Sequence, residues 1–260
     1  MADLEYTVED GIGTILLNRP AMKNAFTFEM IDQWAEALRS ARTDPAVRVV
    51  VLTGAGGAFC SGVDLDDFES QAIGPMPLKS ALTDRIHRVA LALEDLDKPV
   101  VAAVNGVAVG AGMDMALMCD IRLMARSARL SEGYIKVGLV PGDGGCYFLP
   151  RLVGMAKALE LLWTGDWIDS EESHRLGIAN HVYADDEFAD AWRGYARRLA
   201  DQPPINVAMI KRAAYQSART DLRTALDLIS SHMGVVRSTR DSAEAMEAFR
   251  GRRAPIFEGR

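Results

Sequence analysis

The chain has 260 residues, of which 49% are hydrophobic and 25% are charged, and this composition is typical of a globular protein with one large core. Its formal net charge of −7 argues against a general nucleic-acid-binding surface. The three cysteines are widely spaced and the four histidines are scattered, so we expect reduced core thiols and no metal site.

The first half of the chain alternates between strand-like and helical patterns. Leu4–Glu9 and Ile12–Leu17 predict a hairpin that turns at Asp10-Gly11. Apolar residues at helical spacing predict an amphipathic helix over Phe28–Ala41. Short runs rich in β-branched residues predict buried strands at Val47–Thr53, Val100–Val104 and Ile121–Ala125. Strands separated by helices indicate crossover connections and a largely parallel or mixed sheet.

The second half is mainly helical. We expect a loop and the start of a helix over 67–84, a strand at Ala179–Tyr183, and a hinge at Gln202-Pro203-Pro204. The expected helices are 145–164, 170–176, 186–200, 204–217, 221–235 and 241–249. The pattern therefore predicts an α/β core, which we place at residues 1–200, followed by a helical C-terminal region at 201–260.

The most apolar stretch, PVVAAVNGVAVGAGMDMALMC at 99–119, contains one carboxylate, Asp114. Asn105, several glycines and Asp114 make it a poor membrane span. The N-terminus shows no basic segment followed by an apolar block, so we expect no secretory signal, no membrane contact and a cytoplasmic protein.

Two glycine-bearing turns each follow a strand-like run, one at Ser61–Asp64 and one at Gly110–Gly112. Glycine allows close approach of backbone to a ligand, and the first amides of a helix are unsatisfied donors. If the two turns face each other, their amides point at one oxygen, as in an oxyanion hole. The glycine cluster GAGGAF at 54–59 does not open directly into a long helix, which disfavours a dinucleotide-binding loop.

The sequence resembles the crotonase superfamily, also called the enoyl-CoA hydratase/isomerase family, over nearly its whole length and in the order of the family's motifs. The resemblance implies a crotonase-like spiral of ββα units. The matching segments are NRPAMKNAF (18–26), VVVLTGAGGAFCSGVDL (49–65), KPVVAAVNGVAVGAG (98–112), CDIRLMARSARL (119–130), VGLVPGDGG (137–145), LPRLVG (149–154), WTGDWIDSEESHRLGIANHV (163–182) and FRGRRAPIFEGR (249–260).

The resemblance implies that a coenzyme A thioester binds with its carbonyl oxygen between the amides of Val63 and Ala111. Further substrate-binding residues implied in this way are Lys23 near the nucleotide end, Gly62, Asp64, Leu65 and Asp66 along the pantetheine arm, and Gly110 and Gly112 at the second turn. Coenzyme A is then part of the substrate, and no separate cofactor is implied.

Asp114 lies where many family members have a catalytic glutamate, and an apolar setting raises a carboxyl pKa toward the range useful for proton transfer. A first-turn aspartate that favours the helix dipole is the structural alternative. The resemblance places Tyr134 where hydratases have a second glutamate. Glu132, two residues earlier, lies on the same face if this segment is extended and is a candidate substitute. Asp143 is a candidate catalytic acid or an N-cap of the next helix.

These residues leave the reaction open between hydration and double-bond isomerisation of an enoyl-CoA. The alternatives are a β-dicarbonyl hydrolase or carbon–carbon lyase of the same superfamily, and an acyl-CoA binding protein without activity. The resemblance also implies assembly through the C-terminal helices into a homotrimer or a dimer of trimers. Leu226, Met233, Val236 and Met246 suit such an interface, and packing within the subunit explains them equally well.

Overall fold

Two sheets form the framework of the computed structural model, which describes residues 2–71 and 74–260. In these residues a six-stranded sheet has the order β1-β2-β3-β5-β7-β10, and a four-stranded sheet has the order β4-β6-β8-β9. The larger sheet consists of β1 (Leu4–Glu9), β2 (Ile12–Leu17), β3 (Val49–Gly54), β5 (Val100–Val104), β7 (Ile121–Ala125) and β10 (His181–Tyr183). The smaller consists of β4 (Ala58–Cys60), β6 (Val107–Val109), β8 (Arg129–Ser131) and β9 (Ile168–Asp169).

The predicted strands of the larger sheet are confirmed, and their residues explain their positions. Asp10 and Gly11 both have positive φ, 51° and 81°, and close the antiparallel hairpin in which Glu9 faces Ile12. β3 and β5 pair in parallel and are buried along their length, as expected for strands covered on both faces.

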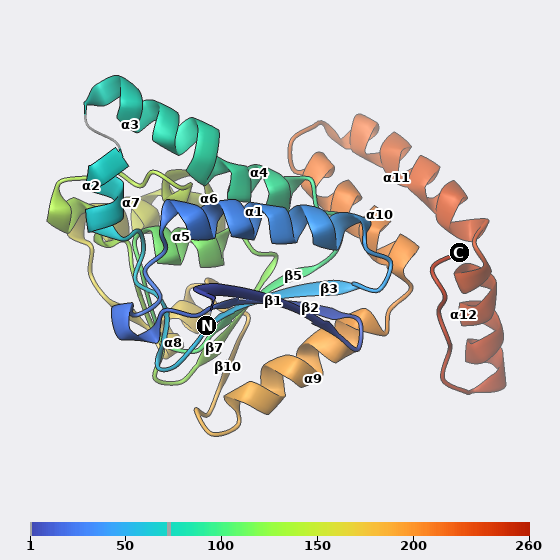
Figure 1. The fold of residues 1–260 in the computed structure, drawn as a ribbon. Helices are drawn as coiled ribbons and strands as arrows, with labels where there is room; N and C mark the ends of the chain where they lie inside the picture. Colours follow the sequence, from blue (N-terminus) through green and yellow to red (C-terminus); the bar gives the residue numbers. More distant parts are fainter. Residues whose placement is uncertain (1, 72–73) are drawn as a thin grey trace.

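Helices cover both faces of the larger sheet (Figure 1). α1 (Phe28–Thr43) and α4 (His87–Glu94) pack together on one face, and α9 (Phe188–Ala200) lies on the other. The remaining helical elements are η1 (Pro20–Met22), α2 (Leu65–Gln71), α3 (Pro75–Ala81), η2 (Leu82–Ile86), α5 (Ala111–Leu117), η3 (Gly133–Val137), α6 (Gly145–Val153), α7 (Met155–Thr164), α8 (Ser170–Arg175), α10 (Pro204–Ser217), α11 (Leu222–Arg237) and α12 (Arg240–Gly251). None of the described helices combines the length and apolar composition that a membrane crossing requires.

Three predictions about helices and cysteines differ from the structure. The helix expected over 145–164 is broken into α6 and α7, because Gly154 between them has φ 78°. The segment 67–84, expected as a loop and a helix start, is mostly helical in α2, α3 and η2, with residues 72 and 73 outside the described range. Cys60 and Cys119 are buried as expected, but Cys146 is exposed.

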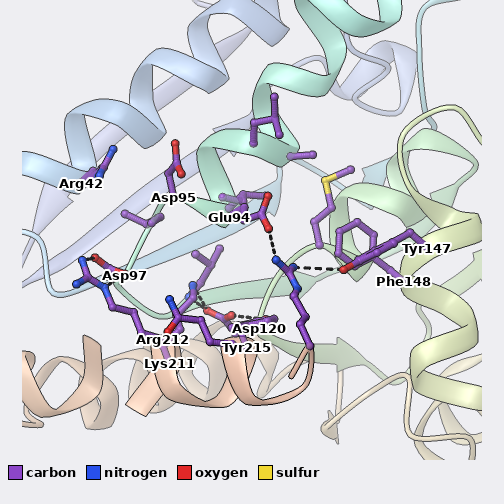
Figure 2. Close-up of a pocket in the computed structure, with 18 residues that line it drawn as sticks. Arg42, Glu94, Asp95, Asp97, Asp120, Tyr147, Phe148, Lys211, Arg212 and Tyr215 are labelled. Atoms are coloured by element: carbon purple, nitrogen blue, oxygen red, sulfur yellow. Dashed lines mark hydrogen bonds and ion pairs between the residues drawn. The ribbon is translucent and has the colours of Figure 1, made fainter. Parts of the chain in front are cut away.

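The helix α10 forms two ion pairs with the core, Lys211 with Asp120 and Arg212 with Asp97 (Figure 2). The Asp120 carboxylate accepts hydrogen bonds from Lys211 Nζ at 2.7 Å, from Tyr215 Oη at 2.7 Å and from the amide of Val100 at 2.8 Å. A cavity of about 840 Å³ lies between α10 and the end of α4. Its lining contains similar numbers of acidic and basic side chains, which largely pair with one another, so it lacks the charge excess of an anion site.

We expect Asp120→Ala to lower the free energy of unfolding by about 2 kcal/mol, because it removes the carboxylate that accepts hydrogen bonds from Lys211, Tyr215 and the Val100 amide. Urea unfolding measures this loss, and hydrogen exchange should show faster opening of α10. Asp227→Ala on the exposed surface of α11 is the matched control. Equal stability of the two variants would contradict the docking role of Asp120.

Candidate active site

The two glycine turns predicted from the sequence lie side by side. β4 and β6 pair in parallel, and each leads directly into one of the turns. A Cβ atom on Gly62 would stand 3.0 Å from the Val109 carbonyl oxygen and 3.6 Å from the Ala111 amide nitrogen. Gly62 has φ 99° and Gly110 has φ 51°, a region that favours glycine.

The amides of Val63 and Ala111 donate no hydrogen bond to another described residue. Both sequence neighbours of Val63 form hydrogen bonds with Phe26: the Gly62 carbonyl accepts one from the Phe26 amide, and the Asp64 amide donates one to the Phe26 carbonyl. The Val63 amide therefore faces away from Phe26. Ala111 begins α5 after Gly110, so its amide is one of the unsatisfied donors of a helix N-terminus.

Asp114 is completely buried on α5, every residue of which is buried. Its carboxyl makes no side-chain cap at the start of the helix. Instead, its Oδ2 lies 2.8 Å from the Tyr134 hydroxyl. The structural alternative, an aspartate placed only to favour the helix dipole, does not account for this contact.

Glu132 and Tyr134 also enter the buried region, but not from an extended strand. β8 ends at Ser131, and Tyr134 belongs to the 3-10 helix η3, so the extended backbone assumed for this segment is wrong. Glu132 is 1% exposed, and neither of its oxygens has a hydrogen-bond partner among the described residues. A Cβ on Gly145 would stand 2.5 Å from Asp114 Oδ1 and 2.8 Å from Glu132 Oε1, so both carboxyls surround this glycine.

Asp143 completes the cluster. It is 6% exposed, and its Oδ2 lies 2.8 Å from the Tyr134 hydroxyl. Gly144, not Asp143, is the N-cap of α6, and no side chain caps this helix. The capping interpretation of Asp143 is therefore wrong, because the turn with Gly144 at φ 125° directs the carboxyl inward. Asp114, Glu132, Tyr134 and Asp143 form what we call the acid cluster.

Burial dominates the electrostatics of the acid cluster. It raises the pKa of Asp114 to about 7, and the negative charge of Asp143 acts in the same direction against the hydrogen bond from Tyr134. Burial, with the charge of Asp114 added to it, raises the pKa of Glu132 to about 10. Burial also raises the pKa of Asp143 and, well above its usual range, that of Tyr134. At neutral pH the cluster therefore holds protons that exposed carboxyls would have lost.

The other predicted substrate-binding residues lie around the first turn. The exposed Lys23 accepts a hydrogen bond at its carbonyl from the Ser61 amide at 3.0 Å. Leu65 and Asp66 are exposed in the first turn of α2. The Asp64 carboxylate is engaged within the protein, because Arg19 Nη1 lies 2.9 Å from it. Partial burial alone would raise the pKa of Asp64, but the hydrogen bonds from Arg19 and backbone amides lower it.

Sequence reasoning did not single out two residues that shape the cluster. His87 Nε2 lies 2.7 Å from the carbonyl oxygen of Gly142 and can donate to it, which holds the turn that carries Asp143. The scattered histidines gave no signal for this contact. Gly145 packs against two carboxyls, and only the run of glycines in VPGDGG pointed to a close approach there.

Unpaired backbone amides on two adjacent turns, beside buried acid–base groups, are the arrangement of an enzyme active site. In the described part of the chain no group of three or more histidine, cysteine, aspartate or glutamate side chains has a geometry that could hold a metal ion. The fold and the site therefore define the chain as an enzyme of the α/β class.

Comparison with known proteins identifies the family. The model of the enoyl-CoA hydratase/isomerase family matches residues 7–260, and the chain belongs to this family. It is 39% identical to 1,2-epoxyphenylacetyl-CoA isomerase of Escherichia coli over 254 residues, and this alignment covers 97% of each chain. It is 32% identical to crotonyl-CoA hydratase of Syntrophomonas wolfei over 96% of this chain and 95% of the relative. A crystal structure of enoyl-CoA hydratase from Bacillus anthracis matches 100% of both chains with a TM-score of 0.94 and 30% identity.

Proposed function

We propose that the enzyme moves a carbon–carbon double bond in an acyl-CoA thioester by proton transfer. Asp114 and Asp143 exchange protons with the substrate, and the amides of Val63 and Ala111 bind the thioester oxygen. The observation that carries this proposal is the contact of both carboxyls with Tyr134, which leaves Oδ1 of each without a hydrogen-bond partner among the described residues. A pair of linked, buried carboxyls suits removal of a proton from one carbon and delivery to another.

The amide pair stabilises the charge that this chemistry creates. When a proton leaves the carbon beside the thioester carbonyl, the electron pair of the broken C–H bond moves onto the carbonyl oxygen. Each fixed donor in a site that excludes water contributes about 2.7 to 4 kcal/mol to an oxyanion. The enolate then takes a proton at the far end of the allylic system, a new C–H bond forms, and the double bond comes to lie at a new position.

Hydration is the second candidate function, and Glu132 is the observation that favours it. Glu132 and Asp114 surround Gly145, and hydration needs one group to activate water and another to deliver a proton. The pKa of Glu132 is raised to about 10, which makes it a neutral donor at physiological pH. Relatives with 32% and 35% identity carry the names crotonyl-CoA hydratase and (E)-benzylidenesuccinyl-CoA hydratase.

The coenzyme A portion of the substrate lies along the first turn in this proposal. Gly62 and the segment from Val63 to Asp66 contact the pantetheine arm, and the exposed Lys23 meets the nucleotide end. Gly110 and Gly112 shape the second turn. Asp64 acts by holding this wall to Arg19 rather than by binding substrate with its carboxylate. Coenzyme A is part of the substrate, and the reaction needs no further cofactor.

A single assay tests the proposed reaction. Purified enzyme is offered a series of 2-enoyl-CoA and 3-enoyl-CoA thioesters while the absorbance of the conjugated thioester is followed and the products are identified. Isomerisation creates conjugation from 3-enoyl substrates, and this is the expected result. Loss of conjugation with gain of water would favour hydration, and release of free thiol or a shortened acid would favour the hydrolase or lyase alternatives. Tight binding without turnover of any substrate would overturn the catalytic proposal.

We expect Asp143→Asn to lower turnover about 100-fold or more, because the amide cannot transfer a proton. The stability of the variant should not fall below that of wild type, since Asp143 caps no helix. Steady-state kinetics and thermal unfolding are measured together. A variant that loses stability but keeps its turnover would remove Asp143 from the proposed acid–base pair.

Self-association through the C-terminal helices completes the proposal. Leu226 is 53% exposed, Met233 62% and Phe249 82%, so packing within the subunit does not account for their apolar side chains. Burial of such a surface favours assembly of copies of the chain, and we expect a homotrimer or a dimer of trimers. Sedimentation equilibrium of wild type and of Leu226→Glu tests this, and a monomeric wild type would contradict it.

A further inference from the structure

The hydroxyl of Tyr134 lies between two carboxyl oxygens but has one proton to donate. Its oxygen lies 2.8 Å from Asp114 Oδ2 and 2.8 Å from Asp143 Oδ2. A phenol that donates to one carboxylate can only accept from the other group. One of the two aspartates must therefore carry a proton on Oδ2 and donate it to Tyr134.

The position of Tyr134 is fixed and shielded from water. The residue is 9% exposed, and a Cβ on Gly110 would stand 3.6 Å from two carbons of its ring. The ring thus packs against the second glycine turn, where Ala111 presents its amide. Buried hydrogen-bonded chains of this kind strengthen one another and are rigid. Exchange of protons with solvent is correspondingly restricted at all three groups.

We propose that Tyr134 relays protons between Asp114 and Asp143 and so restores the active site after each turnover. This inference rests on the isomerase function proposed above. In one turnover the anionic carboxyl takes a proton from one substrate carbon, and the neutral carboxyl gives its proton to another. The pair then has the reversed protonation. A proton moves from the newly protonated aspartate to the Tyr134 oxygen as the phenol proton moves to the other aspartate. No proton is gained or lost overall, and no water takes part.

Neighbouring groups favour one resting arrangement. The charge of Asp143 helps to raise the pKa of Asp114, which favours the arrangement in which Asp143 is the anion and Asp114 keeps its proton. The pKa of Asp143 is itself raised by burial, and His87, on α4, offsets part of that rise. Glu132 is neutral near pH 7 because burial raises its pKa to about 10. The proton chain thus runs from Asp114 through Tyr134 to Asp143.

The kinetics of Tyr134→Phe test the relay. The phenylalanine ring keeps the packing on Gly110 but removes the bridging oxygen. We expect the first equivalent of product at a rate close to wild type, and later turnovers slowed about 100-fold because reversed carboxyls must re-equilibrate with solvent. Rapid-quench measurements with enzyme near the substrate concentration resolve this burst. Tyr6→Phe is the matched control, because Tyr6 lies outside the acid cluster and its buried hydroxyl has no hydrogen-bond partner among the described residues. This variant should show no burst.

Two results would overturn the relay. The first is that the later turnovers of Tyr134→Phe are as fast as those of wild type. The second is that the first turnover of Tyr134→Phe is as slow as its later turnovers. The latter would make Tyr134 a positioning residue only. If wild type does not isomerise any enoyl-CoA, the proposed function fails, whereas the bridge that the relay requires is tested separately by the protonation state of the aspartates.

That state is measurable without turnover and without a variant that might misfold. Infrared spectroscopy is carried out on wild-type enzyme with carbon-13 in its aspartate carboxyls. The label shifts the absorption bands of the aspartates away from the band of Glu132. We expect the band of a protonated aspartate slightly below neutral pH, where exposed aspartates are ionised, and its loss in Asp114→Asn. Absence of that band in wild type would show that no aspartate donates to Tyr134, and the relay would be excluded.

Discussion

Asp114→Asn is expected to lower turnover of an enoyl-CoA thioester by about 10²- to 10⁴-fold, the usual contribution of a positioned acid–base group. Asparagine has nearly the same shape and can still bond to the Tyr134 hydroxyl, which lies 2.8 Å from the native carboxyl. It cannot take or give a proton, however. Binding of the coenzyme A portion should be unaffected, because the residue lies at the buried end of the site.

The same substitution should stabilise the protein above neutral pH. The pKa of Asp114 is about 7 in the folded chain against an ordinary value of 3.8. A group whose pKa is raised by folding stabilises the folded state most below its unfolded value, and this contribution is lost as the pH rises through the folded value. Each pKa unit corresponds to about 1.4 kcal/mol, so we expect Asp114→Asn to gain on the order of 4 kcal/mol at alkaline pH.

Urea unfolding on both sides of neutrality measures this pH dependence. The difference between wild type and Asp114→Asn should be small below the ordinary pKa of 3.8, should widen as the pH rises toward the folded pKa of about 7, and should stay constant above it. Asp227→Asn, on the exposed surface of α11, should show no such widening. An active Asp114→Asn enzyme would contradict the catalytic role of Asp114, and a variant that is destabilised at alkaline pH would contradict the burial argument.

The larger sheet was predictable because all its strands except the three-residue β10 are long enough to show a pattern. The hairpin of β1 and β2 was expected with the bounds that the structure gives it, since alternation and an Asp-Gly turn agree. The smaller sheet was not expected at all. β4, β6 and β8 have three residues each and β9 has two, and such lengths show no periodicity. Yet β4 and β6 are the strands that hold the two glycine turns together.

The acid cluster was predictable in membership but not in arrangement. Asp114 drew attention as the carboxylate in an apolar helix, and the resemblance to the enoyl-CoA hydratase/isomerase family drew attention to Glu132, Tyr134 and Asp143. Their meeting depends on two irregular backbone features: the 3-10 turn that begins after Glu132 and the turn at Gly144 with φ 125°. Neither feature has a sequence period, so the bridging position of Tyr134 could be found only from the structure.

Gly112→Ala is expected to damage both the fold and the oxyanion site. A Cβ at this position would stand 2.1 Å from the carbonyl oxygen of Cys60 and 2.7 Å from its carbonyl carbon. These are backbone atoms, so the turn after β4 must move away from the start of α5. We expect a loss of 1 to 3 kcal/mol in the free energy of unfolding, roughly the cost of overpacking a core.

The movement should cost more in catalysis than in stability, because the Val63 and Ala111 amides sit on opposite sides of that contact. An oxyanion donor that is lost or misaligned costs about 10²- to 10³-fold in turnover. Gly194→Ala on the exposed side of α9 is the matched control, since its Cβ would meet no atom within 4 Å. Urea unfolding and steady-state kinetics of both variants provide the comparison. If Gly112→Ala unfolds more easily but turns over at the wild-type rate, the two amides do not act together on one oxygen, because their separation would then be irrelevant to the reaction.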